Sequence, residues 1–477
     1  MLAIGPAAPI RLERSNNTQI QAQFKNTGHV HGRPGRLGTK VARETDVLTL
    51  LLPPVVSVKE NDRAITGLVM LGHALVHTYE LSLPLLILVW AEVFPAVTIP
   101  GVGAFQTTPF VLGAVLTVGY APFGLGAVPG GVLADRFGSQ RLIVACLAGM
   151  GLSFAMVAVA PTLLTVAIAL LGWGLAASVY HPSGLALISK GADARGAVFA
   201  YHGMAGNVGI AVGPLLTAVL LFLTGDWRLV AAGLAGPALL GAVLATRMEL
   251  DEGARATPAD GGRTETALTG GFVADSKRLF GSLFALAFVL SMFSGVYYRG
   301  VLTFLPDLLS TFEQLEPISV SGAPRSLQPD QYVYSGLLMV GVLGQYVGGR
   351  LTDKLTVTLP LAAGYGVLSV IALLFLPVAT HSLAGLAVAG ALLGFFLFMI
   401  QPLYQATIAE YTPSSLRGLS YGYTYTSVFG VGALGGTLAG ATLTYGTQRL
   451  LFLLLAGFAA GAMGLAAVLF RRGQAAA

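Results

Sequence analysis

The sequence predicts an all-α membrane protein, with twelve transmembrane helices arranged in two pseudo-symmetric six-helix bundles. Three observations predict this fold class: long apolar segments, basic residues gathered in alternate connections, and motifs that recur in the two halves. A helix of roughly 20 apolar residues crosses a hydrocarbon core of about 30 Å. The 477 residues are 55% hydrophobic and only 10% charged, which excludes a soluble globular domain, where about 25% are charged.

The apolar segments give the order of the predicted spans. They lie near 65–94, 108–134, 140–160, 162–189, 197–224, 227–247, 279–308, 331–352, 355–378, 383–410, 418–444 and 448–470. The polar stretch 248–278 is predicted to be a cytoplasmic central loop, because it separates six spans in 65–247 from six in 279–470.

The two ends of the chain are polar. Residues 1–64 predict a cytoplasmic tail without periodic structure, and residues 471–477 a short cytoplasmic tail. The long tail is either disordered or largely untranslated, since a start near Val56 or Val58 would leave residues 1–55 unmade.

The lysines and arginines predict the orientation. Of the 27, 23 lie in the tails and the even-numbered connections, three in the other connections, and Arg299 within a span. Positive residues stay on the cytoplasmic side, so both termini are predicted in the cytoplasm and the protein in the plasma (inner) membrane. The net charge of +5 therefore reflects orientation rather than nucleic-acid binding. We expect a monomer whose partners are the lipid bilayer and a small-molecule solute.

Two motifs recur in the two halves. Residues 129–136 (PGGVLADR) resemble residues 347–354 (VGGRLTDK) at an offset of 218 positions, and His181–Pro182 has a counterpart in Gln401–Pro402. Repeats of six spans are typical of secondary transporters, which bind solutes at the interface between the halves.

Residues 130–141 (GGVLADRFGSQR) resemble the signature of the major facilitator superfamily, and residues 65–470 have that family's layout. Within it, Leu71–Gly72–His73, Tyr180–His181–Pro182, Gly206–Asn207 and residues 213–216 (GPLL) are similar to the fosmidomycin-resistance-protein subfamily. Thr78 and Ser183 depart from that subfamily, which tends to have carboxylates there. The resemblance implies proton-driven transport, often export.

The signature predicts a conformational latch on the cytoplasmic side. Its expected members are Gly130, Gly131, Asp135, Arg136 and Arg141, with Asp353 and Lys354 from the second copy. The glycines leave room for a neighbouring helix, and Asp135 is expected to accept hydrogen bonds from a neighbouring helix N-terminus. The alternative is an ordinary charged loop end.

Ionisable residues in the first span predict a proton-coupling site. His73, His77 and Glu80 share one helical stripe, and ionisable groups at membrane depth usually face the bundle interior. Glu80 is the first candidate for proton coupling, and a structural carboxylate is the alternative. No metal is expected, because the set lacks an H-E-x-x-H pattern and a visible fourth ligand. No cofactor is expected either, the proton gradient being the energy source.

Arg299 is the first candidate for solute binding, because it lies one position from the mirror image of Glu80 in the first helix of the second half. It is expected to pair with Glu80 or to bind an anionic group, and snorkelling to the headgroups is the alternative. The other solute-binding candidates are His181, Tyr298, Trp173, Gln401, Tyr404, Gln405, His202 and Asn207.

These residues predict a secondary active transporter that exports a small organic, anionic solute in exchange for protons by alternating access. Proton-coupled uptake of an organic anion is the alternative, and a non-transporting membrane sensor is the alternative of another class. An enzyme is not expected, because no nucleophile–base set accompanies the histidines.

Overall fold

A computed structural model describes residues 60–254, 271–413 and 416–476. The chain divides into two units, residues 1–57 and 58–477, and every described element belongs to the second. The predicted tail before residue 60 and the middle of the predicted central loop lie outside the described residues.

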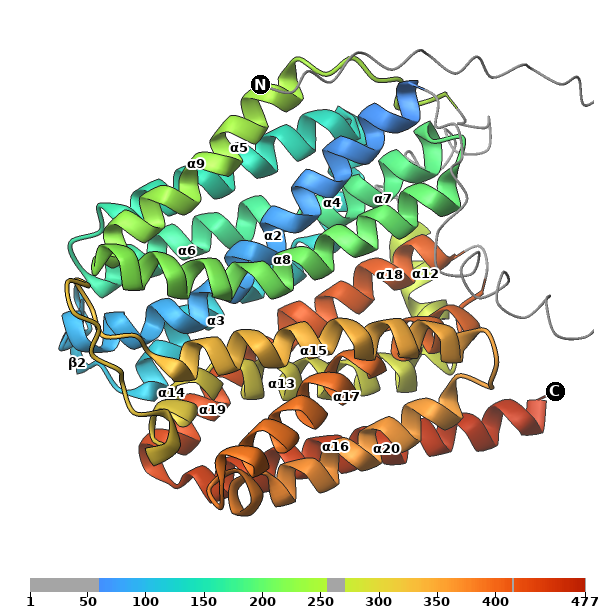
Figure 1. Ribbon diagram of the computed structural model, residues 1–477. Coiled ribbons are helices and arrows are strands. Elements are labelled where there is room, and N and C mark those ends of the chain that lie inside the picture. Colours follow the sequence, from blue (N-terminus) through green and yellow to red (C-terminus); the bar gives the residue numbers. More distant parts are fainter. Residues whose placement is uncertain (1–59, 255–270, 414–415, 477) are drawn as a thin grey trace, which may run out of the picture. The chain divides into compact units, whose positions relative to one another are not determined.

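The first half of this unit consists of helices and one short hairpin (Figure 1). Its helices are α2 (Glu60–Val93), α3 (Pro109–Leu125), α4 (Ala127–Phe137), α5 (Ser139–Ala158), α6 (Leu163–Ala177), α7 (Tyr180–Gly191), α8 (Arg195–Thr224) and α9 (Trp227–Thr246). The hairpin pairs β1 (Ala96–Ile99) with β2 (Gly103–Gln106) in antiparallel register between α2 and α3.

The second half repeats the helical arrangement. Its elements are α12 (Gly271–Phe280), α13 (Phe284–Leu302), α14 (Leu305–Ser310), the 3₁₀ turn η1 (Glu313–Leu315), α15 (Pro329–Thr352), α16 (Thr358–Ala379), α17 (Leu383–Glu410), α18 (Arg417–Tyr425), the π-helical turn η3 (Thr426–Val431), α19 (Leu434–Tyr445) and α20 (Gln448–Ala476). The helix α12 occupies a stretch that the sequence interpretation assigned largely to a loop.

The membrane-protein prediction is confirmed. Among the described residues, ten helical segments are long and apolar enough to span a bilayer, and α3 with α4, bent by 49°, gives an eleventh. The predicted eighth span corresponds to α15, a single helix of 24 residues that is not among them. It carries Asp330, Gln331, Gln345 and Arg350, which lower its hydrophobicity.

Local sequence explains several helix ends. The Thr108 side chain accepts a hydrogen bond from the Val111 N–H and Pro109 follows as the first residue of α3, an arrangement that favours helix initiation. The Ser382 side chain caps α17 in the same way, and Gly225, with φ of 66°, ends α8.

Small residues allow the helices to pack closely. In Figure 1 α2 and α8 lie side by side, and their backbones meet at glycines of α8. A Cβ atom on Gly209 would collide with the Ala74 carbonyl, and one on Gly213 would lie 2.6 Å from the Thr78 carbonyl oxygen. Such close contacts between backbones supply the packing energy that holds membrane helices together.

Candidate functional site

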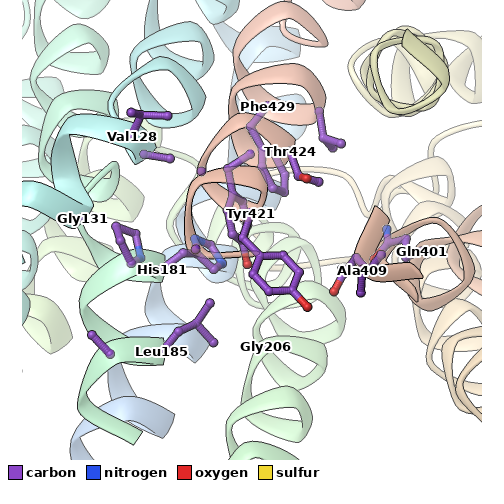
Figure 2. A pocket seen from close by; sticks show the side chains of 18 of the residues that line it. Val128, Gly131, His181, Leu185, Gly206, Gln401, Ala409, Tyr421, Thr424 and Phe429 are labelled. Atoms are coloured by element: carbon purple, nitrogen blue, oxygen red, sulfur yellow. The ribbon is translucent and has the colours of Figure 1, made fainter. Parts of the chain in front are cut away.

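A chamber of about 1060 Å³ lies between the two halves. Helices α2, α4, α7 and α8 of the first half line it, together with α12, α13, α15, α17, α18 and η3 of the second. In Figure 2, His181 from the first half lies across from Tyr421, Thr424 and Phe429 of the second. The volume is slightly above the range that is typical of small-molecule sites, about 300–1,000 Å³.

Among the described residues, those that line the chamber extend to one end of the bundles. Its lining includes Asp135 near the end of α4, Lys190 near the end of α7, and Asp275 of α12. These residues flank the predicted cytoplasmic connections. We call the end of the bundles at which Asp135, Lys190 and Asp275 lie the open end.

The opposite end is sealed by contacts between α3 and α19. The Phe110 N–H donates to Thr444 Oγ1 at 2.9 Å. Thr117 Oγ1 lies 2.8 Å from the Ala433 carbonyl oxygen and 2.8 Å from Thr437 Oγ1. These hydrogen bonds join the two halves directly, and we call this the closed end.

Glycines bring the backbones together at the closed end. A Cβ atom on Gly113 would collide with the Gly436 carbonyl, and one on Gly440 would collide with the Pro109 carbonyl. A larger side chain at either glycine would therefore push α3 and α19 apart.

A buried ion pair joins the first helices of the two halves next to the deep end of the chamber. Arg299 of α13 donates to Glu80 Oε1 of α2 at 2.5 Å, with side-chain exposures of 2% and 0%. Both side chains therefore point inward, and Arg299 pairs with the acid, which is one of its two expected roles. Neither residue lines the chamber, so Arg299 presents no free guanidinium to it.

Tyr120 of α3 supports this pair, and the sequence interpretation missed it. The Tyr120 hydroxyl donates to the Glu80 carbonyl oxygen at 2.8 Å, and its ring lies 3.6 Å from the guanidinium carbon of Arg299. This geometry combines a hydrogen bond with a cation–π contact. A tyrosine in an apolar span gives no sequence signal for such a role.

Four histidines gather beside the ion pair. His73 and His77 of α2, His181 of α7 and His202 of α8 are all buried, and all line the chamber. The rings of His73 and His202 stack at 3.8 Å, and the rings of His73 and His181 lie 5.2 Å apart. The ligand atoms of His73, His77 and His181 lie within 4.8 Å of one another, so this trio is the candidate metal-binding set of the described residues.

Hydrogen bonds connect this cluster to Glu80. His77 Nδ1 lies 2.6 Å from Glu80 Oε2, and His77 Nε2 lies 3.1 Å from His73 Nε2. His73 Nδ1 lies 2.7 Å from the carbonyl oxygen of His202. The predicted stripe of His73, His77 and Glu80 is thus one continuous hydrogen-bonded chain that starts at the chamber and ends at the ion pair.

Most of the other predicted solute-binding residues line the chamber. They are His181, His202, Asn207, Tyr298, Gln401, Tyr404 and Gln405. Trp173 is a correction, because its ring is fully buried in α6 and packs 5.8 Å from both Tyr120 and Phe123. It therefore supports Tyr120 instead of forming a wall.

The predicted latch has a different arrangement from the one expected. Asp135 pairs with Lys190 at 2.7 Å within the first half, and it does not cap a helix. Glu252 takes that role, since its carboxylate accepts from the N–H groups of Ser139 and Gln140, at 2.6 and 3.1 Å. Glu252 follows α9 and lies 113 positions after Ser139 in the sequence, so the spacing of residues along the chain gives no sign of this cap.

The other residues of the predicted latch are two glycines of α4 and four exposed charged residues. A Cβ atom on Gly130 would lie 3.1 Å from Pro182, as expected for a close helix contact, whereas Gly131 lines the chamber. The remaining members, Arg136, Arg141, Asp353 and Lys354, are exposed.

The family model of the Major Facilitator Superfamily matches residues 81–434 and 326–477. The chain therefore belongs to the Major Facilitator Superfamily. Membership agrees with the expectation of a transporter rather than an enzyme. The resemblance to the fosmidomycin-resistance-protein subfamily stays a prediction.

Curated relatives and solved structures are consistent with this family. The chain is 38% identical over 109 residues to an uncharacterized MFS-type transporter of Mycobacterium tuberculosis, a match that spans 22% of this chain and 25% of the relative. The solved nucleoside transporter NupG is 15% identical, with a TM-score of 0.66 over 86% of this chain and all of that one.

Two further solved structures have the same fold. A D-xylose-proton symporter is 16% identical, with a TM-score of 0.61 over 85% of this chain and 97% of that one. A bacterial homolog of the human lysosomal transporter Spinster, in an inward-facing and occupied conformation, is 16% identical, with a TM-score of 0.60 over 86% and 96% of the two chains.

Proposed function

We propose that this chain is a secondary active transporter that exports a small organic solute in exchange for protons. The observation that carries the proposal is a chamber between two matching halves that is open at one end and sealed at the other. Rocking of the halves about such a chamber exposes its site first to one side and then to the other. The basic residues of the connections predict that the open end faces the cytoplasm.

The Glu80–Arg299 pair supplies the proposed link between protons and movement. Because it joins α2 to α13, parting of the two halves at this level would break it. Separating a buried ion pair leaves two uncompensated charges, which is strongly unfavourable. A proton on Glu80 removes one of those charges, so proton binding favours the state in which the two halves have parted.

The walls of the chamber favour a small organic solute with hydrogen-bonding groups. Tyr298, Gln401 and Gln405 of the second half and Asn207 of the first provide donors and acceptors on opposite sides. Aromatic and apolar walls with a few placed polar groups are typical of sites for small organic molecules.

Proton-linked uptake of an organic anion is a second candidate function, and one observation favours it. Arg299 is engaged by Glu80, so an anionic group can replace that carboxylate only after Glu80 has lost its charge. The proton and the anion would then bind together instead of competing, and by linkage each raises the affinity for the other. An anionic solute therefore favours symport, whereas a neutral or cationic solute is compatible with exchange.

Purified protein in vesicles that contain a pH-sensitive dye tests both candidates. The solutes to test come from a growth and toxicity screen with the gene deleted and overexpressed. Solute added outside would make the vesicle interior more alkaline under exchange and more acidic under symport. Glu80→Gln should abolish the change in pH, and Glu313→Gln, at an exposed position of η1, is the matched control. A wild-type response in Glu80→Gln would show that the coupling role of Glu80 is wrong.

A further inference from the structure

We propose that His73, His77 and His181 form a binding site for a divalent transition-metal ion at the deep end of the chamber. The three rings come from two helices, α2 and α7, and their ligand atoms lie within 4.8 Å of one another. All three side chains line the chamber, so an ion can reach them from the open end. The site does not depend on the direction of transport or on its coupling to protons.

The hydrogen bonds of two rings leave their other nitrogens available to a metal. His77 Nδ1 donates to Glu80 Oε2, and His73 Nδ1 donates to the carbonyl oxygen of His202, because a carboxylate and a carbonyl only accept. In each neutral ring Nε2 is then a bare lone pair. These two nitrogens lie 3.1 Å apart; an added proton between them makes their hydrogen bond, and a metal ion that binds both nitrogens takes the place of that proton.

The spacing is close to that of a coordination shell. Two nitrogens bound to a tetrahedral zinc ion at about 2.0–2.1 Å lie about 3.3–3.4 Å apart. The His73–His77 separation of 3.1 Å is near this value, and the longest separation in the set, up to 4.8 Å, has to contract by about 1.4 Å.

His181 is the ligand that can move to complete the shell. It lies in the first turn of α7, directly after the break between Ala177, the last residue of α6, and Tyr180. Within the part of the chain that the structure describes, its ring has no hydrogen-bond partner. Pro182 follows it at a position where proline is tolerated in a helix. A small rotation of this side chain closes the set without disturbing α2.

The surroundings resemble the outer shell of a metal site. Histidines that bind metals usually donate their second nitrogen to a carboxylate or a backbone carbonyl, which fixes the ring and raises its basicity. His77 and His73 each have such a partner, in Glu80 and in the His202 carbonyl. The His202 ring also holds the plane of His73 by stacking on it, with an angle of 14° between the rings.

The donor set determines the class of metal. Neutral imidazoles favour zinc, copper, nickel and cobalt, whereas magnesium and calcium require oxygen ligands. No metal was expected from the sequence, because the set of His73, His77 and Glu80 lacks an H-E-x-x-H pattern and a visible fourth ligand. The fold adds His181 and gives both Glu80 oxygens other partners, His77 and Arg299. A bound ion would offer an anionic solute the positive charge that Arg299, paired with Glu80, does not present to the chamber.

Titration of the full chain in detergent with Co²⁺ tests the site, because visible absorption of Co²⁺ reports the number and type of its ligands. Two further histidines, His29 and His31, are replaced by alanine in every sample to remove a competing H-x-H pair. We expect one equivalent of Co²⁺ with a tetrahedral or five-coordinate spectrum, displaced by Zn²⁺ and not by Mg²⁺. Zn²⁺ should also raise the thermal unfolding temperature, since a ligand that binds only the folded state stabilises it.

The variants separate this site from other binding. His181→Ala and His77→Ala should lower the affinity at least tenfold, and Glu80→Gln by about 10- to 100-fold through the lost outer-shell contact. His381→Ala, at an exposed position, is the matched control and should bind as the parent does. His181→Gln serves as a second variant if the alanine variant does not fold, as judged by size-exclusion chromatography.

Absence of saturable binding at one equivalent would overturn the proposal. So would an affinity that is unchanged in folded His181 and His77 variants, because the ion would then bind elsewhere. Failure of the vesicle assay for proton coupling would leave these binding results unaffected.

Discussion

Two ion pairs of similar length lie at opposite ends of the chamber and differ in almost every other respect. Glu80–Arg299, at 2.5 Å, is buried and joins the two halves, whereas Asp135–Lys190, at 2.7 Å, has side chains 36% and 34% exposed and lies within the first half. In water the attraction between exposed charges is screened and balanced by side-chain entropy. In the interior each charge depends on its partner, because no solvent replaces it.

The comparison shows that distance alone does not rank these contacts. Burial makes the inner pair costly to break, and its position between α2 and α13 makes it sensitive to movement of the two halves. The outer pair can exchange its partner for water at little cost.

Removal of Arg299 should have the largest effect. Arg299→Leu leaves Glu80 buried without its partner, and we expect the free energy of unfolding to fall by about 3–5 kcal/mol. Denaturant unfolding of the purified protein in detergent measures the change. The double variant Glu80→Leu with Arg299→Leu should recover most of the loss, because two apolar residues replace both charges. If Arg299→Leu were as stable as the parent protein, Glu80 would not depend on Arg299 as its buried partner.

A larger side chain at the closed end should shift the conformational equilibrium. Gly113→Leu forces α3 away from the Gly436 carbonyl, at a cost of about 1–3 kcal/mol to the sealed state. This corresponds to a roughly 5- to 150-fold shift toward a state open at that end. A cysteine at Thr437, in a Cys146→Ser background, should then react faster with an impermeant maleimide. Equal reaction rates with and without Gly113→Leu would show that this contact does not seal the end.

Tyr120 should contribute a smaller amount through two separable contacts. Tyr120→Phe removes the hydrogen bond to the Glu80 carbonyl and keeps the ring over Arg299, so we expect a loss of about 1 kcal/mol. Tyr120→Leu also removes the cation–π contact and should cost a further 0.5–2 kcal/mol, roughly. Unfolding measurements as for Arg299 report both values, and identical losses would mean that the ring contributes nothing.

The exposed pair should give the smallest effect. Lys190→Ala is expected to change the free energy of unfolding by at most about 1 kcal/mol, since solvent screens the lost attraction. That small change should disappear in high salt. If Lys190→Ala lowered the free energy of unfolding as much as Arg299→Leu does, the buried and the exposed ion pair would not differ in strength.

Much of the fold follows from the sequence, because lipid makes long apolar helices easy to recognise. The predicted spans correspond to described helices in both halves, and the offset between halves placed Arg299 beside the mirror of Glu80. The helix α12 was not predicted, since it is polar and amphipathic and lies largely in the stretch predicted as the central loop. The bend between α3 and α4 at Gly126 lies in an apolar run without a polar interruption, so hydropathy alone did not reveal it.

The site was predicted only in part, for a reason of geometry. The stripe of His73, His77 and Glu80 lies on one helix, so its spacing shows that the three side chains share a face. The approach of His181 and Tyr120 depends on how α7 and α3 pack against α2, and a single sequence contains no record of those contacts. Trp173 was assigned to the wall of the solute-binding site for the same reason. The span that contains it is apolar on all sides, so the sequence does not show which side of the helix faces the chamber.

The cap that Glu252 places on α5 has a consequence for dissecting the protein into parts. The first half was predicted to end at residue 247, yet its fifth helix depends on a carboxylate five positions later, and the Asp251 N–H also donates to Asn61 at the start of α2. A fragment severed at 247 would lose both anchors. For co-expression of separate halves, the chain should therefore be divided after Glu252. The segment with Asp251 and Glu252 then stays with α2 and α5, to which it is hydrogen-bonded.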